Sequence, residues 1–393
     1  MTDGLLKISF GGDLMCLQAQ NEAVMRKHGR YDYDETLAAL KPLFAESDYV
    51  IANLETPLSD ASLSEEQICF NTPASFAEAV KKAGIHFVQT ANNHCLDRGV
   101  EGMVQTLDVL DRVGLEHNGT YRTREDSDRL FVKEIAGVKV AIVCCTFGTN
   151  SEHNGQILPA DETWRVDLLK RQNKLSKVAS RVSDAPIITS MIPDNVSVAA
   201  ITNSANVAYT DRIKEKILRA KNEADIVVVL PHIGGQYNPA PGAWSKWTVD
   251  WMSQLQPSLI VASHPHVPLR TENVNGVFTA WSLGNLSFTP RVGYYLPNVL
   301  ADYGVVLHTW FDVASKKLVK AGFNLIKNVV GEDGISRIKP VFDLWSESKN
   351  AIERDCLTID NEALVNRLRG ENTTIEINNN YYINVGYKDR YPL

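Results

Sequence analysis

The stretch LLKISFGGD, Leu5 to Asp13, is a short apolar run that ends on two glycines and an aspartate. Apolar runs of this kind, bounded by glycine, are typical of buried strands. A side chain that could bind a ligand therefore follows directly on a predicted strand. The same arrangement recurs along the chain, and its recurrence predicts the fold.

Six further runs have the composition of buried strands: SDYVIA (47–52), IHFVQT (85–90), VKVAIVCC (138–145), ADIVVVL (224–230), PSLIVA (257–262) and GVFTAW (276–281). Helical patterns lie between several of them: YDETLAALKPLFAES (33–47), SFAEAVKKAG (75–84), GVEGMVQTLDVLDRVG (99–114), DRIKEKILRAKNEA (211–224) and WSKWTVDWMSQLQ (244–256). Gly84 and Gly114 stand where helices end. Strands that alternate with helices predict a layered α/β protein whose strands are largely buried.

Two regions interrupt this alternation. Residues 151–208 are polar and irregular, which predicts an insertion that covers or lines a site. From about Ala301 two long β-like runs surround residues 314–317, which predicts a hairpin. We therefore expect a main domain over residues 1–300, and a C-terminal β-hairpin extension over 301–393 that packs on the same core.

Composition excludes some classes of protein. The 393 residues carry a net charge of −7, which argues against non-specific nucleic-acid binding. No run approaches the roughly 20 apolar residues of a membrane span, and the first residues lack the features of a signal peptide. The six cysteines contain no C-x-x-C pair, so we expect a reducing cytoplasm. A protein whose leader has been removed, and which is associated with the cell envelope, would show the same pattern.

Polar side chains follow six of the predicted strands. The strand ends read Gly11-Gly12-Asp13, Asn53-Leu54-Glu55, Asn92-Asn93-His94 with Asp97 beyond, Pro231-His232, Ser263-His264-Pro265-His266 and Ser282-Leu283-Gly284-Asn285. In α/β sheets ligands bind outside the carboxyl ends of the strands. We therefore expect these side chains to converge if the strands are parallel neighbours.

Each of these residues also has a structural interpretation. Asp13, Asn92, Asn93 and Asn285 suit turns, Asn53 and Glu55 suit turns or helix caps, and His232 alone suits a hydrogen-bonded core. Two histidines around Pro265 are harder to explain in this way. Together the residues form a set of oxygen and nitrogen donors without cysteine, which suits Mn²⁺, Fe²⁺ or Zn²⁺. The other five histidines have no such neighbours in sequence, and we interpret them as structural: His28, His86, His117, His153 and His308.

The ordered motifs resemble one known family. They read FGGDLM (10–15), IANLETPL (51–58), TANNHCLDRG (90–99), LPHIGGQY (230–237), ASHPHV (262–267) and WSLGNLSF (281–288). This set is similar to the bacterial capsule-synthesis CapA (PGA_cap, poly-γ-glutamate capsule) family of the calcineurin-like metallophosphoesterase superfamily. The resemblance covers about residues 5–300. It implies a four-layer αββα fold, in which two mixed sheets pack face to face with helices outside.

The resemblance also implies roles for residues. Asp13 and His266 would bind a first divalent metal, and Glu55 would replace the usual bridging aspartate. A second metal would be bound by Asn93, His232 and His264. His94 would be the catalytic group that contacts substrate. Asp97 is a catalytic candidate beside it, and Asn92, Arg98 and Asn285 are candidates for supporting it or for binding substrate.

The chain departs from the superfamily pattern at its first motif. The superfamily begins Asp-x-His, whereas this chain reads Asp13-Leu14-Met15, so one histidine ligand of the first metal is missing. We therefore expect one or two bound ions, and we expect the first metal position to be the less fully occupied of the two. Arg98, Arg270 and Arg291 lie near predicted strand ends, where they would either bind an anionic substrate or simply be solvated.

Two functions remain. One is a metal-dependent hydrolase that cleaves a phosphate ester with a metal-activated water. The other is a non-catalytic component of capsule or poly-γ-glutamate synthesis or export that binds a polyanion. Both take a small or polymeric anion, and the oligomeric state is not predicted.

Overall fold

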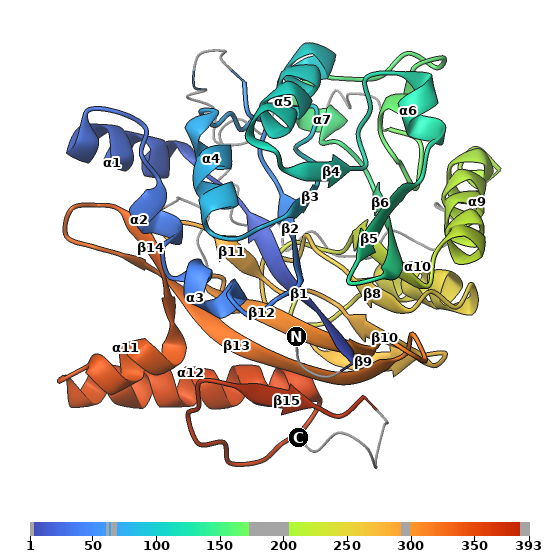
Figure 1. The fold of residues 1–393 in the computed structure, drawn as a ribbon. Coiled ribbons are helices and arrows are strands. Elements are labelled where there is room, and N and C mark those ends of the chain that lie inside the picture. Colours follow the sequence, from blue (N-terminus) through green and yellow to red (C-terminus); the bar gives the residue numbers. More distant parts are fainter. Residues whose placement is uncertain (1–3, 60–62, 64–68, 173–203, 292–298, 386–393) are drawn as a thin grey trace.

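Two β-sheets form the centre of the protein in this computed structural model, which describes residues 4–59, 63, 69–172, 204–291 and 299–385 (Figure 1). The larger sheet has nine strands. Seven run in the order β14 (Ser336–Pro340), β13 (Leu318–Val330), β12 (Tyr303–Asp312), β1 (Leu5–Leu14), β2 (Tyr49–Leu54), β3 (Phe87–Gln89) and β4 (Glu116–Asn118). In addition, β11 (Asn285–Ser287) pairs with β1, and β15 (Tyr381–Ile383) pairs with β13.

The smaller sheet has six strands and lies against the larger one. Its order is β5 (Phe131–Ile135), β6 (Val138–Thr146), β7 (Ile226–His232), β8 (Leu259–Val261), β10 (Val277–Ala280) and β9 (Thr271–Val274). Both sheets are mixed, since each combines parallel and antiparallel pairs. A single apolar cluster fills the space between them, with Phe10 and Phe87 from the larger sheet and Val228 from the smaller.

Helices cover the outer face of each sheet, which completes four layers. One apolar cluster joins the larger sheet to α1 (Gln18–His28), α2 (Asp34–Leu37), α3 (Leu40–Phe44), α4 (Ser75–Lys82) and α5 (Gly99–Val113). Another joins the smaller sheet to α9 (Val207–Glu223) and α10 (Ala243–Gln254). The αββα arrangement predicted from the resemblance is therefore confirmed.

All seven apolar runs lie on strands, and the hairpin of β12 and β13 is where the pattern predicts it. The expected helix over residues 33–47 is instead two short helices, α2 and α3. Gly114 has φ 71° at the end of α5, and Gly84 has φ 98° directly after α4, as expected for residues that end helices.

The segment after residue 300 extends the larger sheet, because β12 pairs antiparallel with β1. Two helices that the sequence patterns do not predict follow it, α11 (Val341–Glu347) and α12 (Ala351–Arg369). Leu364 and Leu368 of α12 belong to the apolar cluster between the sheets. In Figure 1 both helices lie below β13, away from the carboxyl end of β1.

The expected insertion over residues 151–208 is described only in part, since residues 173–203 lie outside the described residues. Before them come α7 (Ser151–Asn154) and the 3₁₀ helix η1 (Thr163–Arg165), and α6 (Arg124–Asp128) lies earlier in the chain. None of the helices that the structure describes is long and apolar enough to cross a bilayer.

Candidate metal centre

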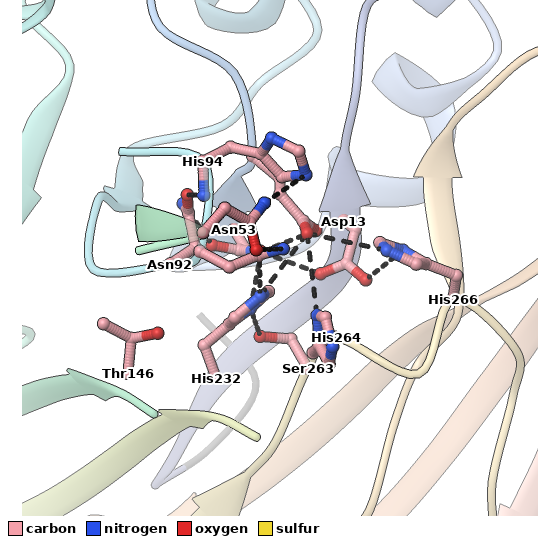
Figure 2. Close-up of polar contacts among 12 residues, drawn as sticks. Asp13, Asn53, Asn92, His94, Thr146, His232, Ser263, His264 and His266 are labelled. Carbon is pink, nitrogen blue, oxygen red and sulfur yellow. Dashed lines mark hydrogen bonds and ion pairs between the residues drawn. The ribbon is translucent and has the colours of Figure 1, made fainter. Parts of the chain in front are cut away.

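Strand ends from both sheets meet at one polar cluster (Figure 2). The larger sheet contributes Asp13 at the end of β1, Glu55 directly after β2, and the loop of Asn92 to His94 after β3. The smaller sheet contributes His232 at the end of β7, and the loop with His264 and His266 after β8. Within each sheet these strands run parallel, so their carboxyl ends lie at the same edge. The predicted convergence is present, but it is built by two facing sheets rather than by one.

Local backbone conformation explains two of the motifs. The backbone carbonyl of Gly284 accepts a hydrogen bond from the Asp13 N–H at 3.0 Å, and a β-carbon on Gly12 would collide with that carbonyl. The glycine before the aspartate therefore permits this close approach. His264 and His266 have φ values of 103° and 57°, which are strained for residues other than glycine. Such strain is concentrated at functional sites.

The ligating atoms form two overlapping groups of three. Glu55, His232 and His264 make one group, Asp13, Glu55 and His266 the other, and the ligating atoms within each lie within 4.8 Å of one another. The Glu55 Oε1 atom is 3.4 Å from His232 Nε2, 4.0 Å from His264 Nδ1 and 3.6 Å from His266 Nε2. Because Glu55 belongs to both groups, it lies where a bridging carboxylate would be needed.

Three atoms of this cluster are buried and form no hydrogen bond of good geometry in the described part of the chain: Asp13 Oδ2, Glu55 Oε1 and His264 Nδ1. Asp13 Oδ2 does lie 3.1 Å from His266 Nδ1, as an ion pair. Both carboxylate side chains have no exposed surface. Burying a carboxylate without compensation costs several kcal/mol, so such atoms normally have partners. A divalent cation would compensate two oxygens and a nitrogen at once, and these donors suit Mn²⁺, Fe²⁺ or Zn²⁺. The residues therefore fit a metal.

The pKa values of the clustered carboxyl and imidazole groups also indicate that a cation would stabilise this cluster. Burial, and next the nearby Asp13 charge, raise the pKa of Glu55 to about 8. Burial lowers the pKa of His232 to about 4 and that of His264 well below its usual value. Burial also opposes ionisation of Asp13 and His266, but their neighbours prevail. The contact with His266 lowers the pKa of Asp13, and the Glu55 charge, followed by the contact with Asp13, raises the pKa of His266. Neutral imidazoles beside carboxylates are the form in which histidine binds metals.

Asn93 lies against the same group of ligands. Its Oδ1 atom is 2.8 Å from His232 Nε2, the nitrogen that also faces Glu55. On its other side, His232 Nδ1 is 2.9 Å from the Ser263 hydroxyl. A proton on Nδ1 donated to Ser263 leaves Nε2 free to bind a cation, which is how the second nitrogen of a ligating histidine is usually held.

His94 is fixed from three sides. Its Nδ1 atom is 2.6 Å from Asp97 Oδ2, and the Phe70 ring stacks on the imidazole with centroids 3.9 Å apart. Asp97 also accepts hydrogen bonds from the Phe70 N–H at 2.7 Å and from Asn154 at 3.2 Å. The Asn150 amide lies 3.4 Å from the remaining nitrogen, His94 Nε2. Nε2 is therefore the nitrogen of His94 that Asp97 does not hold.

Three candidates for substrate binding have other contacts. Asn92 is buried and donates to the Leu54 carbonyl at 2.7 Å. Asn285 is buried as well, and its Oδ1 is 3.1 Å from His266 Nδ1. The Arg98 guanidinium donates to the Phe70 and Cys69 carbonyls, both at 3.1 Å. All three side chains thus form hydrogen bonds or close polar contacts within the protein.

The remaining two arginines lie elsewhere. Arg270 forms an ion pair with Glu272 at 2.7 Å, and Arg291 is exposed. Two residues of the cluster, Asn53 and Ser263, were assigned no site role from the sequence. Ser263 directly precedes His264 and Asn53 lies two residues before Glu55, and this closeness to predicted ligands is the signal that could have identified them.

Comparisons with known proteins give a consistent relationship. The family model described as bacterial capsule synthesis protein PGA_cap matches residues 7–290. The PGA biosynthesis protein CapA of Bacillus subtilis (strain 168) is 26% identical over 297 residues, 73% of this chain and 64% of the relative. The capsule biosynthesis protein CapA of Bacillus anthracis is 25% identical over 289 residues, 72% of this chain and 60% of the relative. The chain thus spans under two thirds of these relatives.

Solved structures are similar only at a distance. A novel phosphatase from Mycoplasma pneumoniae has a TM-score of 0.45 and 16% identity, and covers 82% of this chain and 94% of its own. A putative 5'-nucleotidase from Staphylococcus aureus, solved with alpha-ketoglutarate, has a TM-score of 0.43 and 11% identity, with 89% and 58% coverage. These likenesses are too weak to assign an activity.

Proposed function

Since the chain belongs to the bacterial capsule synthesis protein PGA_cap family, we propose that it is a metal-dependent hydrolase that cleaves a phosphate ester. One observation supports this most: buried carboxylate oxygens and imidazole nitrogens that could bind a metal meet at the edge where both sheets end their parallel strands, and three of these atoms form no hydrogen bond among the described residues. Unpaired buried donors of this kind are retained where they bind a ligand.

Six residues would hold the metal. Asp13, Glu55 and His266 would bind a first ion, and Glu55, Asn93, His232 and His264 a second. When bound, divalent ions supply a nucleophilic water at neutral pH and offset the charge of the phosphate. The identity of the ion is left among Mn²⁺, Fe²⁺ and Zn²⁺, all of which suit nitrogen and oxygen donors.

His94 would act as the general acid. In its protonated form it donates the Nε2 proton to the leaving oxygen, while Asp97 holds Nδ1 and so fixes the direction of the ring. Phe70 keeps water from one face of the imidazole by stacking on it. Arg98 holds the Phe70 segment through its backbone carbonyl and therefore acts on His94 indirectly.

The two ion positions would differ in strength. Met15 stands where the superfamily pattern has a histidine, and it is buried in an apolar cluster with Leu17, Phe70 and Phe288. The first position therefore has three protein donors and the second has four. We expect the second ion to bind more tightly, and the first to be exchangeable.

The same difference favours a second candidate function. An apolar Met15 at the first position suits a protein that retains the centre for binding rather than for turnover. The names of the two Bacillus relatives concern capsule and PGA biosynthesis. In this alternative the chain is a non-catalytic component that binds a polyanion.

Hydrolysis of a panel of phosphomonoesters and phosphodiesters separates the two functions. We expect the purified protein to hydrolyse at least one class of ester with added Mn²⁺, and to lose this activity in EDTA and regain it when Mn²⁺ is restored. Removal of the ion removes the nucleophile, so the loss should be close to complete. Tight Mn²⁺ binding without turnover of any ester would reject the hydrolase and favour the polyanion-binding role.

A further inference from the structure

The side chain of Asn53 lies at the centre of the cluster, although the sequence assigned it no part in binding the metal (Figure 2). It is the last but one residue of β2 and is 4% exposed. Its Nδ2 atom is 2.8 Å from Asp13 Oδ1, 3.3 Å from Glu55 Oε2 and 3.3 Å from His232 Nδ1. One amide thus reaches the carboxylates at the ends of β1 and β2 in the larger sheet, and a histidine at the end of β7 in the smaller sheet.

The amide has two hydrogens, and two of the three neighbouring atoms can accept them, Asp13 Oδ1 and Glu55 Oε2. His232 Nδ1 carries the proton that it donates to the Ser263 hydroxyl at 2.9 Å, so it does not accept from Asn53. The two hydrogens of Asn53 are therefore available for Asp13 and Glu55. Each carboxylate then gives one oxygen to Asn53, and the other oxygen of each faces the histidines: Asp13 Oδ2 is 3.1 Å from His266 Nδ1, and Glu55 Oε1 is 3.4 Å from His232 Nε2.

Asn92 determines which end of the Asn53 amide faces the carboxylates. Its Nδ2 atom donates to Asn53 Oδ1 at 3.2 Å and to the Leu54 carbonyl at 2.7 Å. Because Asn53 Oδ1 must accept from Asn92, the Nδ2 end faces Asp13 and Glu55. Asn92 Oδ1 in turn accepts from the His94 backbone N–H at 3.1 Å. The same chain of amides therefore connects the carboxylates to the loop of His94.

From this geometry we infer that Asn53 is a positioning residue, which binds one oxygen of Asp13 and one of Glu55 so that the other two oxygens are aimed at the metal. This rests on the proposed function, because it assumes that an ion binds there. Outer partners of this kind fix the orientation of metal ligands, and their loss typically costs about 10–100-fold in metal affinity. The hydrogen bonds of Asn53 also offset part of the repulsion between these two neighbouring carboxyl groups.

The test is a titration of the purified full chain with Mn²⁺, followed by calorimetry, for wild type and variants. Asn53→Leu keeps the approximate shape but removes the amide, and should weaken Mn²⁺ binding about 10–100-fold. Asn53→Ser retains one donor and should lie between the two. The absorption spectrum of the Co²⁺-loaded protein should also change in Asn53→Leu, because the ligand geometry is altered.

Asn324→Leu is the matched control. Asn324 is a buried amide on β13, a strand that β12 separates from β1, and its Oδ1 is 2.7 Å from His308 Nε2. Asn324→Leu should lower the free energy of unfolding about as much as Asn53→Leu does, and it should leave the affinity for Mn²⁺ unchanged. If Asn53→Leu does not fold, Asn53→Ser decides by the same criterion.

Mn²⁺ binding within about twofold of wild type, in a folded Asn53 variant, would overturn the inference and leave the proposed function intact. A wild type that binds no Mn²⁺ would reject both. If wild type binds Mn²⁺, Asn53→Leu weakens it, and no ester is cleaved, the positioning role stands and only the hydrolase is rejected.

Discussion

Glu55→Gln should abolish binding of both metal ions at once. Glu55 Oε1 lies within 4.0 Å of a ring nitrogen of each of His232, His264 and His266, and Glu55 belongs to both ligand groups. We expect the loss of affinity to exceed the roughly 100-fold upper range seen when only an outer partner of a ligand is removed. Replacement of His266 alone would by contrast affect one group of ligands.

The stability of the same variant should depend on the ion. Burial beside Asp13 raises the pKa of Glu55 to about 8, so the metal-free fold opposes its ionisation. A folded-state pKa above the usual 4.5 means that the metal-free wild type loses stability as pH rises from 4.5 to 8. A neutral glutamine avoids this cost, so metal-free Glu55→Gln should be at least as stable as metal-free wild type at pH 8.

Thermal unfolding with and without Mn²⁺ measures both effects. The free ion concentration is set to 100 times the wild-type dissociation constant. The ion should then raise the free energy of unfolding by about 2.7 kcal/mol in wild type and by at most about 0.4 kcal/mol in the variant. Glu22→Gln, an exposed change on α1, is the control and should gain as much as wild type. Equal gains in wild type and Glu55→Gln would show that Glu55 does not bind the ion.

His94→Gln should lower ester turnover about 10²–10⁴-fold while metal content stays at the wild-type value. This range is typical for the loss of a general acid. His94 contacts Asp97, Phe70 and Asn150, and none of these is a proposed metal ligand. Its replacement should therefore leave the metal ligands in place. The measurement is kcat on the best ester of the panel, with metal content determined on the same sample.

His153→Gln is the matched control for this variant. His153 is an exposed histidine on α7, close in sequence to the Asn150 that faces His94, and its loss should leave kcat unchanged. A loss of metal in His94→Gln equal to the loss of turnover would show that His94 is a ligand and not an acid.

The sequence allowed the strands and most of the metal ligands to be predicted for one physical reason. Buried strands are continuous apolar runs, and a polar group directly after such a run must lie at the edge of the sheet. Asp13, Glu55, His232 and His264 all follow runs of this kind, and all four lie in the cluster.

Other features depend on contacts between distant segments, which a pattern along one chain does not contain. The pairing of β1 with β12 brings residues about 300 apart into one sheet, and α12 has no strong amphipathic stripe that would mark a buried face. Arg98 lies beside predicted site residues in sequence, yet its guanidinium bonds the Phe70 carbonyl. Asn53 looks like a turn residue until Asp13 is placed on the neighbouring strand.

The metal content of the purified protein tests the central claim most directly. Wild type and His264→Ala, both purified without chelator and then equilibrated with Mn²⁺ or Zn²⁺, are compared by elemental analysis. We expect at least one divalent ion per chain in wild type and a clear loss in His264→Ala, because His264 Nδ1 is a buried donor without another partner among the described residues. A wild type without bound metal, and unchanged by His264→Ala, would contradict the account.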